Sequence, residues 1–359
     1  MTSTGPFTGV NTDTTGSTAT TGSTATTGST ALVVAAPGEV ALTARTAAAA
    51  GPGDTLVRPD LVGLCGTDLE IIDGQVDPAF IRYPLALGHE WTGIVTGDSP
   101  LAGTRVVAEG IVACGHCSRC ARGETNLCET YDEFGFTRDG AAASLVAVPA
   151  ALIHPLAADV TAEDAVLTEP ASVVYRGLTR AAAGPADRVL VIGDGTIALL
   201  AVYLLRLWSP AEVVLLGPRP AKAELAARAG ASRFELSPEA AGAGYDLVVE
   251  AAGSIQAAAV ALTAARRGGT VLLLGLPPHG QTVALGVDDV VNNDLSILGS
   301  FSYTAAAWRD VVRLLNAGLI RPGFVVTHRF PLAAYEQALA CLRSGDGPRG
   351  KVLLQLGSG

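Results

Sequence analysis

Four cysteines within a short stretch carry the strongest chemical signal in the sequence. Cys114, Cys117, Cys120 and Cys128 follow one another at spacings of 3, 3 and 8 residues. Cys-x2-Cys spacing turns the backbone so that the sulfurs converge, and four thiolates complete a tetrahedral zinc shell with no open position. We therefore predict a structural zinc ion here. The neighbouring His116 is an alternative ligand, although the four thiols suffice.

A second group of ligand types is spread over three segments. It comprises Cys65-Gly-Thr-Asp68, Gly88-His-Glu90 and Glu169-Pro170. Taken singly, a cysteine is usually a small core residue, and a glutamate before proline favours a helix N-terminus. Together the segments offer a thiolate, an imidazole and carboxylates, the donor set of a catalytic zinc with an open position for water or substrate. We therefore predict two zinc ions per chain.

A glycine-rich turn provides a candidate nucleotide site. Gly193-Asp-Gly195-Thr196-Ile197-Ala198 follows the apolar run 188–192 and opens a stretch that we expect to be helical. In this setting the first glycine permits the tight turn, the second admits the pyrophosphate, and Ala198 allows close helix–sheet packing. The helix N-terminus then faces the phosphates. The alternative is a glycine turn in a doubly wound sheet that binds no ligand.

The end of the next expected strand bears on the choice of cofactor. An NAD site normally places Asp or Glu there to bind the ribose 2′-hydroxyl. This strand instead ends in Leu216-Gly217-Pro-Arg219, with Lys222 one turn further on. Two cations without a carboxylate suit a 2′-phosphate, so NADP(H) is favoured over NAD(H). The alternative is that Arg219 and Lys222 are only solvated residues at a helix start.

The strands and helices that must position these residues follow two different sequence patterns in the two halves of the chain. Between residues 32 and about 155, short strand-like runs alternate with turn residues, which predicts a partly open β-barrel. After about residue 180, apolar runs alternate with helical stretches, which predicts a parallel sheet covered on both faces. These runs are 188–192, 212–216, 245–250, 269–274 and 295–298. A helix over 305–317 and a strand over 351–355 close the chain.

Composition excludes several classes of protein. The 359 residues are 49% apolar and 16% charged, with a net charge of −10. This is too apolar for a globally disordered chain, and without a Lys/Arg cluster we expect no nucleic-acid partner. The longest apolar run, 189–205, is broken by glycines, so we expect no membrane span. With no recognisable export signal, we expect a cytoplasmic protein whose six cysteines are metal ligands rather than disulfides.

The N-terminal segment differs from the rest of the chain. Residues 14–31 are three copies of Thr-Thr-Gly-Ser-Thr-Ala, which have no apolar periodicity. Such a polar repeat cannot bury enough surface to order itself. We therefore predict that residues 1–31 are a disordered tail and that the folded part begins near Leu32.

Taken in order, these motifs resemble the zinc-dependent medium-chain dehydrogenase/reductase family over about residues 32–356. The resemblance implies an α/β fold with a GroES-like β-barrel catalytic domain over 32–180 and a doubly wound Rossmann domain over 181–304. The stretch 305–359 then returns to the catalytic domain. The resemblance also implies a homo-oligomer, either a dimer or a tetramer.

Within that family, Glu169-Pro-Ala-Ser-Val-Val-Tyr-Arg176 resembles the branch of polyol, glucose, threonine and cyclitol dehydrogenases. In that branch a glutamate takes the place of a second cysteine at the catalytic metal. The resemblance thus implies Cys65, His89 and Glu169 as zinc ligands, and Glu90 as a ligand or an exchange partner. Which carboxylate binds at rest stays open.

The resemblance also assigns roles around the metal. Thr67 is implied as the hydroxyl that relays the substrate proton, and Asp68 as the carboxylate that orients His89. Gly275 and Phe301 are implied as further cofactor contacts. Zinc would lower the pKa of the substrate hydroxyl, and a hydride would pass to the nicotinamide.

The expected activity is therefore hydride transfer between NADP(H) or NAD(H) and a small secondary alcohol or ketone. The substrate implied is a polyol, sugar or aminocyclitol, with a threonine 3-dehydrogenase-like amino-alcohol or a ketone of secondary metabolism as alternatives. A zinc-free enone reductase would lack Cys65 or His89, and both are present. A non-enzymatic zinc-lobe binding module would show a basic surface and no nucleotide site, which is the opposite of this sequence.

Overall fold

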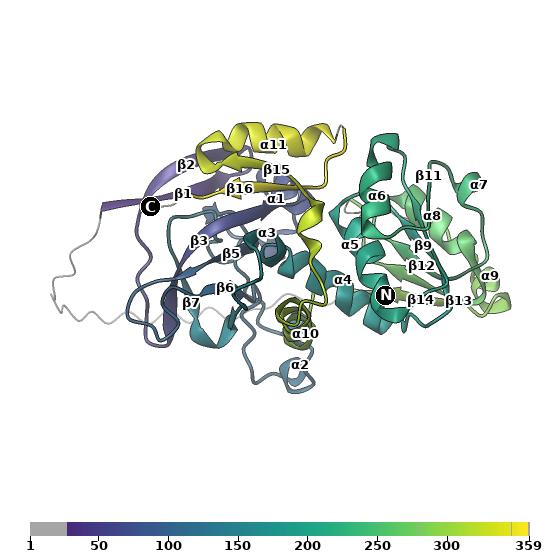
Figure 1. Cartoon of the computed structure of the whole chain (residues 1–359), viewed down its shortest axis with the longest axis horizontal. Coiled ribbons are helices and arrows are strands. Elements are labelled where there is room, and N and C mark those ends of the chain that lie inside the picture. Colours follow the sequence, from purple (N-terminus) through teal and green to yellow (C-terminus); the bar gives the residue numbers. More distant parts are fainter. Residues whose placement is uncertain (1–26, 279, 346, 358–359) are drawn as a thin grey trace, which may run out of the picture.

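The computed structural model describes residues 27–278, 280–345 and 347–357. The chain forms two parts that lie side by side (Figure 1). One part is built from β1–β8 and the C-terminal strands β15 and β16, and the other contains β9–β14. The predicted combination of a part built from short strands with a doubly wound parallel sheet is confirmed.

The catalytic part consists of two sheets with short helices around them. One sheet has the order β15-β16-β3-β5-β6-β8, with β7 also paired to β3, and the other has the order β2-β1-β4. The strands are β1 (Thr27–Ala36), β2 (Glu39–Thr46), β3 (Asp54–Leu64), β4 (Leu85–Ala86), β5 (Glu90–Val95), β6 (Arg105–Ala108), β7 (Val146–Pro149), β8 (Ile153–Pro155), β15 (Val326–Pro331) and β16 (Lys351–Gln355). The helices are α1 (Gly66–Ile72), α2 (Ser118–Ala121), α3 (Ala162–Ala165), α4 (Thr168–Arg180) and α11 (Tyr335–Ser344).

The folded part begins earlier than the sequence predicts. β1 starts at Thr27 and pairs antiparallel with β2, so the expected boundary at residue 32 is wrong by five residues. Backbone hydrogen bonds to a neighbouring strand do not depend on apolar side chains, so a Thr-Gly-Ser-Thr repeat can extend a hairpin. The prediction of disorder for residues 1–26 concerns a segment outside the described residues.

The Rossmann part is a parallel sheet with the strand order β11-β10-β9-β12-β13-β14. Its strands are β9 (Arg188–Ile192), β10 (Glu212–Leu216), β11 (Arg233–Glu235), β12 (Tyr245–Glu250), β13 (Ala265–Leu273) and β14 (Ser296–Gly299). Its helices are α5 (Thr196–Leu205), α6 (Ala223–Ala229), α7 (Pro238–Ala241), α8 (Ile255–Ala264) and α9 (Val287–Asn292), and α10 (Ala305–Asn316) follows. The strand order reverses between β9 and β12, and folds of this kind bind nucleotides at this point.

Two segments connect the parts. Helix α4 packs against both α5 and α10, and it carries Glu169 in its first turn. The chain then returns to the catalytic part, where β16 pairs antiparallel with β3. The loop between α11 and β16 extends toward α6 of the Rossmann part (Figure 1). Segments from the middle and from the C-terminal end of the chain therefore connect the two parts.

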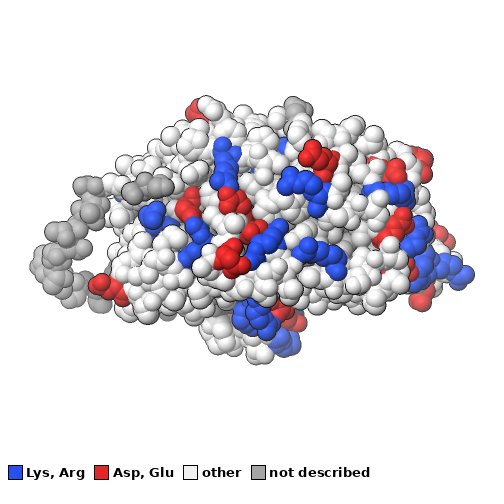
Figure 2. All heavy atoms as spheres, in the orientation of Figure 1, with Lys and Arg blue, Asp and Glu red and all other residues white. Residues whose placement is uncertain are grey.

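The distribution of surface charge and the length of the helices can be compared with what nucleic-acid binding or membrane insertion would require. On the face seen in Figure 2, basic and acidic side chains are interspersed rather than gathered by sign. In the described ranges, every helix is too short or too polar to cross a bilayer.

Candidate active site

The first two residues of the predicted catalytic zinc site face each other. Cys65 follows β3 and caps helix α1, where its sulfur accepts the backbone N–H of Thr67 at 3.2 Å. His89 lies just before β5, and its Nε2 is 3.3 Å from the Cys65 sulfur. The pairing of β3 with β5 brings the ends of these two distant segments together.

Asp68 contacts both members of this pair. One oxygen of its fully buried carboxylate accepts the Cys65 backbone N–H at 2.8 Å, and the other lies 3.5 Å from His89 Nδ1. A carboxylate on one ring nitrogen directs the other toward a metal. A thiolate and an imidazole nitrogen so arranged fit a zinc ion, because both are ligands that zinc prefers.

Glu90 is paired with a residue that the sequence reasoning missed. Its carboxylate contacts the amino group of Lys351, and both side chains are buried. A Cβ at Gly63 would lie 2.8 Å from Lys351 Cε, so only glycine leaves room for this pair. The other Glu90 oxygen is 3.9 Å from His89 Nε2. One oxygen of Glu90 thus lies near the expected metal position, and the other is ion-paired with Lys351.

Glu169 approaches the same position from the first turn of α4. Burial, and then the neighbouring Glu90 carboxylate, raise the pKa of Glu169 to about 8. At this site, the ligand atoms of Cys65, Asp68 and His89 lie within 4.8 Å of one another, and both glutamates lie outside this group. The structure thus brings Cys65 and His89 together and places two carboxylates nearby.

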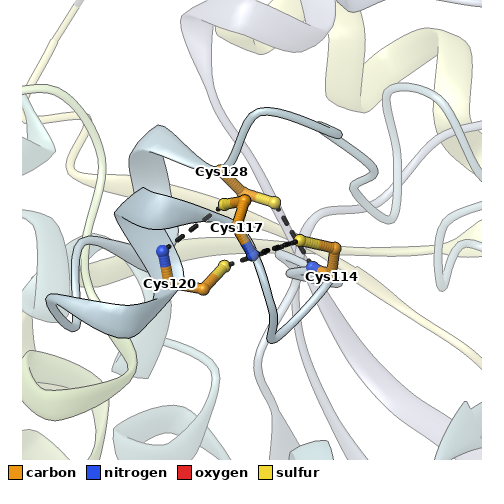
Figure 3. A group of neighbouring side chains, drawn as sticks. All are labelled: Cys114, Cys117, Cys120 and Cys128. Carbon is orange, nitrogen blue, oxygen red and sulfur yellow. Dashed lines mark hydrogen bonds between the residues drawn. The ribbon is translucent and has the colours of Figure 1, made fainter.

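The four-cysteine segment forms a compact group (Figure 3). The sulfurs of Cys114, Cys117, Cys120 and Cys128 lie within 4.8 Å of one another, and all four thiols are free. Backbone N–H groups point at them: those of Cys117 and Cys120 are each 3.4 Å from a neighbouring sulfur. This set fits a closed tetrahedral zinc site. His116 is exposed and bonds the Cys114 carbonyl instead.

The glycine-rich turn has the shape of a pyrophosphate cradle. Gly193 has a φ of +118°, and a Cβ there would lie 3.0 Å from the backbone of Ala251. A Cβ at Gly195 would meet nothing within 4 Å, so the backbone is open to a ligand there. Helix α5 starts at Thr196 without a side-chain cap, which leaves N–H groups for phosphate oxygens. Thr196 and Ile197 are half-buried in this first turn.

A carboxylate fills the space beside Gly217, which corrects the expectation that none is present. A Cβ on Gly217 would lie only 2.5 Å from the Cβ of Asp194. Asp194 is buried and ion-paired with the Arg219 guanidinium, whose Nε is 3.0 Å from Oδ1. The sequence reasoning missed this pair because Asp194 belongs to the turn after β9 and Arg219 follows β10; the parallel alignment of the two strands brings them together.

Known proteins resemble this chain over most of its length. Residues 51–158 match the alcohol dehydrogenase GroES-like domain, and residues 162–346 match the glucose dehydrogenase C-terminus. An L-threonine 3-dehydrogenase from Chromobacterium violaceum is 30% identical over 85% of this chain and 92% of its own length. An erythritol/L-threitol dehydrogenase from Mycolicibacterium smegmatis is 30% identical, over 82% and 88%.

The chain belongs to the zinc-dependent medium-chain dehydrogenase family. Solved structures agree with this assignment. A Sinorhizobium meliloti protein classed as a zinc-binding dehydrogenase and bound to NADP has a TM-score of 0.84 and 27% identity, covering 91% of this chain and 99% of its own. An Escherichia coli alcohol dehydrogenase complexed with NADH has a TM-score of 0.83 and 26% identity, covering 91% and 99%. This chain is therefore a zinc-dependent alcohol or polyol dehydrogenase that uses a nicotinamide cofactor.

The other two expected cofactor contacts of this dehydrogenase lie at the edge of the Rossmann sheet. Gly275 follows β13, and a Cβ there would lie 2.6 Å from the Glu250 carboxylate, so glycine is required. Phe301 follows β14 with 42% of its surface exposed. Its carbonyl accepts the Asn126 amide at 2.7 Å, which ties this edge to the four-cysteine lobe.

A buried carboxyl group in this dehydrogenase was also missed. Glu133 is 5% exposed, and burial raises its pKa to about 7. It lies beside Gly110, whose N–H donates to the buried Tyr303 hydroxyl at 2.7 Å. Residues 110, 133 and 303 come from separate loops, and an isolated glutamate in a loop gives no sequence signal of burial.

Proposed function

We propose that this dehydrogenase oxidises a secondary alcohol of a polyol, sugar or aminocyclitol, with NADP(H) preferred over NAD(H). Cys65 and His89 hold the catalytic zinc together with Glu169, and Glu90 serves as the exchange carboxylate. The single observation that supports this most is the 3.3 Å approach of Cys65 Sγ to His89 Nε2, with Asp68 on the other ring nitrogen. A zinc ion held there supplies the Lewis acidity that lowers the pKa of the substrate hydroxyl.

The chain's own residues supply the remaining chemistry. Asp68 keeps His89 in the tautomer that presents Nε2 to the metal. Thr67, in the first turn of α1, accepts the substrate proton and passes it outward. Lys351 neutralises Glu90, and both groups of this ion pair are buried. A nicotinamide cofactor held by the turn at residues 193–198 would supply the hydride acceptor.

The choice of Glu169 over Glu90 as the resting ligand rests on charge. Lys351 pairs directly with Glu90. Glu169 lies near two further carboxyl groups, Glu90 and Glu133, and the charges of His89 and Lys351 oppose their effect only in part. A largely buried carboxylate without a direct ion pair is costly, and a metal ion would remove that cost. The unneutralised group is therefore the better candidate for the ligand.

The NADP(H) preference follows from the residues near the adenosine end. Arg219 and Lys222 follow β10, and their charge exceeds that of Asp194 by one unit. The solved relative with bound NADP supports this preference, and the relative with bound NADH marks the alternative. Binding of both cofactors by calorimetry separates the two. Tighter binding of NADPH supports the preference, and tighter binding of NADH contradicts it.

The proposal also covers the cellular compartment and the oligomeric state of the enzyme. Six free thiols and two zinc sites point to a reducing compartment such as the cytoplasm. Exposed apolar side chains at Leu276, Val287 and Val291, each at least 70% exposed, support a homo-oligomer that covers them.

A substrate panel tests the activity directly. Reduction of NADP+ and NAD+ is followed with polyols, inositols, aminocyclitols and threonine. The names of the relatives favour erythritol, threitol and threonine as first members. Turnover of a polyol supports the proposal. If only threonine is oxidised, the substrate is an amino alcohol rather than a polyol. If none of these substrates is oxidised, the proposed substrate class is wrong.

A further inference from the structure

The segment 300–305, which follows β14, is held at several points by the catalytic part. It contains Phe301, an expected cofactor contact, and it ends on the first residue of helix α10. Within it, Ser302 has a φ of +53°, a backbone conformation that residues other than glycine seldom adopt. Such a conformation costs free energy and persists only where the surrounding structure holds it. The contacts around this segment therefore decide its shape.

Two of these contacts come from the four-cysteine lobe. The amide of Asn126, which is buried, donates to the Phe301 carbonyl at 2.7 Å. The Thr125 hydroxyl accepts the backbone N–H of Ala305 at 2.9 Å. Asn126 and Thr125 lie in a short 3-10 helix that ends directly before Cys128, one of the four thiols. The place of this short helix therefore depends on how the four cysteines are held.

The remaining contacts come from helix α4 and from the loop before the lobe. Arg176 of α4 donates to the Ser300 hydroxyl at 2.8 Å. The N–H of Gly110 donates to the Tyr303 hydroxyl at 2.7 Å. Tyr303 is buried; burial raises its pKa, and the charge of Glu169 is one of those that add to this. The segment therefore extends from the expected cofactor contact toward the carboxyl groups of the predicted zinc site.

We propose that Asn126 and Thr125 are positioning residues for the nicotinamide half of the cofactor, because they hold the segment 300–305 in the shape that presents Phe301 to the nicotinamide ring. The Phe301 carbonyl is anchored by Asn126, whereas 42% of the surface of Phe301 is exposed and free to contact a ligand. The four-cysteine lobe then acts on cofactor binding as well as on stability. This inference rests on the expected contact between Phe301 and the cofactor, and not on the substrate class.

The test compares each reduced cofactor, NADH or NADPH, with its counterpart that lacks the nicotinamide ring, ADP-ribose or its 2′-phosphate. Calorimetry on the zinc-loaded, full-length enzyme measures the affinities. Asn126→Leu removes the donor to the Phe301 carbonyl at similar side-chain size. We expect it to weaken binding of the reduced cofactors about three- to tenfold, the effect of losing one hydrogen bond, and to change binding of the ADP-riboses less than about twofold.

Thr125 offers a matched pair of variants at a half-buried position. Thr125→Val removes the hydroxyl acceptor and nearly keeps the shape, so it should show the same selective weakening. Thr125→Ser keeps the hydroxyl and should bind like the wild type. Ser118→Ala is the control within the lobe, because the Ser118 hydroxyl donates to Glu129 at 2.8 Å and its loss should change neither affinity. Zinc content should equal the wild-type value in all of these variants.

Phe301→Ala separates the inference from the contact on which it rests. If Phe301→Ala binds the reduced cofactors as tightly as the wild type, the expected contact is wrong and the inference fails with it. If Phe301→Ala shows the selective weakening but Asn126→Leu and Thr125→Val bind like the wild type, the contact stands and the lobe does not position it. Equal weakening of the reduced cofactors and the ADP-riboses by Asn126→Leu or Thr125→Val also overturns the inference, because it indicates a general loosening of the enzyme.

Discussion

The amino group of Lys351 contacts the carboxylate of Glu90, and neither group is exposed. The pair bridges β16 and β5, which are separated by β3, across the gap that Gly63 leaves open. It therefore joins the last strand of the chain to the segment that carries His89. The catalytic site depends on the C-terminus in a way that its motifs do not reveal.

Breaking this pair should destabilise the enzyme. Lys351→Met leaves the Glu90 carboxylate buried without a cation, which costs about 3–5 kcal/mol. We expect a clearly lower thermal midpoint, with much of the loss recovered when Glu90→Gln is added. Lys351→Arg, which keeps the charge, serves as the control. An unchanged midpoint in Lys351→Met would mean that the pair contributes nothing.

The two zinc sites should respond differently to loss of a thiol. Cys65→Ser should abolish turnover, keep the fold and retain one zinc ion, because the four-cysteine lobe is separate. Cys117→Ser should lose the lobe zinc and lower the thermal midpoint, since structural zinc contributes directly to folding. Metal analysis and thermal unfolding of both variants check this. A stable Cys117→Ser protein together with an active Cys65→Ser enzyme would reverse the assignment.

Asp194 should limit the affinity for NADP(H). Asp194→Asn removes a negative charge beside Gly217 and releases Arg219 from its ion pair. We expect NADPH affinity to rise several-fold relative to NADH, because charge-assisted hydrogen bonds to phosphate are stronger than neutral ones. Fluorescence titration of both reduced cofactors measures the ratio. Asp98→Asn, at an exposed position, is the control. A ratio that moves toward NADH would show that Asp194 does not oppose the phosphate.

Deleting the N-terminal residues with or without β1 should have different effects on stability. Deleting residues 1–26 should leave kcat and the thermal midpoint unchanged, since a polar repeat buries little apolar surface. Deleting residues 1–36 removes β1, whose Leu32 and Val34 are fully buried, and should destabilise the catalytic part. Thermal unfolding and turnover of both truncations check this. A large loss of kcat in the shorter deletion would reveal a role for the repeat.

Three buried strands of the Rossmann sheet could be predicted to the residue, whereas β13 begins four residues before the predicted run 269–274, β14 is shifted by one residue from the run 295–298, and the short β11 was missed. The runs 188–192, 212–216 and 245–250 coincide with β9, β10 and β12, because a strand covered on both faces is continuously apolar. Helix 305–317 and strand 351–355 agree within one residue of α10 and β16. In these elements the local pattern and the tertiary environment require the same residue types.

The pairings of charged residues could not be predicted in the same way. Lys351 reaches Glu90 only through the pairing of β16 with β3 and of β3 with β5, which no local pattern specifies. Asp194 and Arg219 meet because β9 and β10 are aligned in parallel, and the loop between α11 and β16 lies beside them through contacts between the two parts. Motifs identified the ligand types, whereas strand register decided which charges neutralise one another.

The most direct test of the account is hydride transfer measured before and after removal of the catalytic metal. The zinc-loaded enzyme is assayed for reduction of NADP+ with the best alcohol of the panel, then treated with a chelator, and then supplied with zinc again. We predict that turnover disappears on chelation and returns with zinc in the wild type, and that Cys65→Ser stays inactive throughout. Turnover that persists in the metal-free enzyme or in Cys65→Ser would contradict a zinc-dependent site at Cys65 and His89.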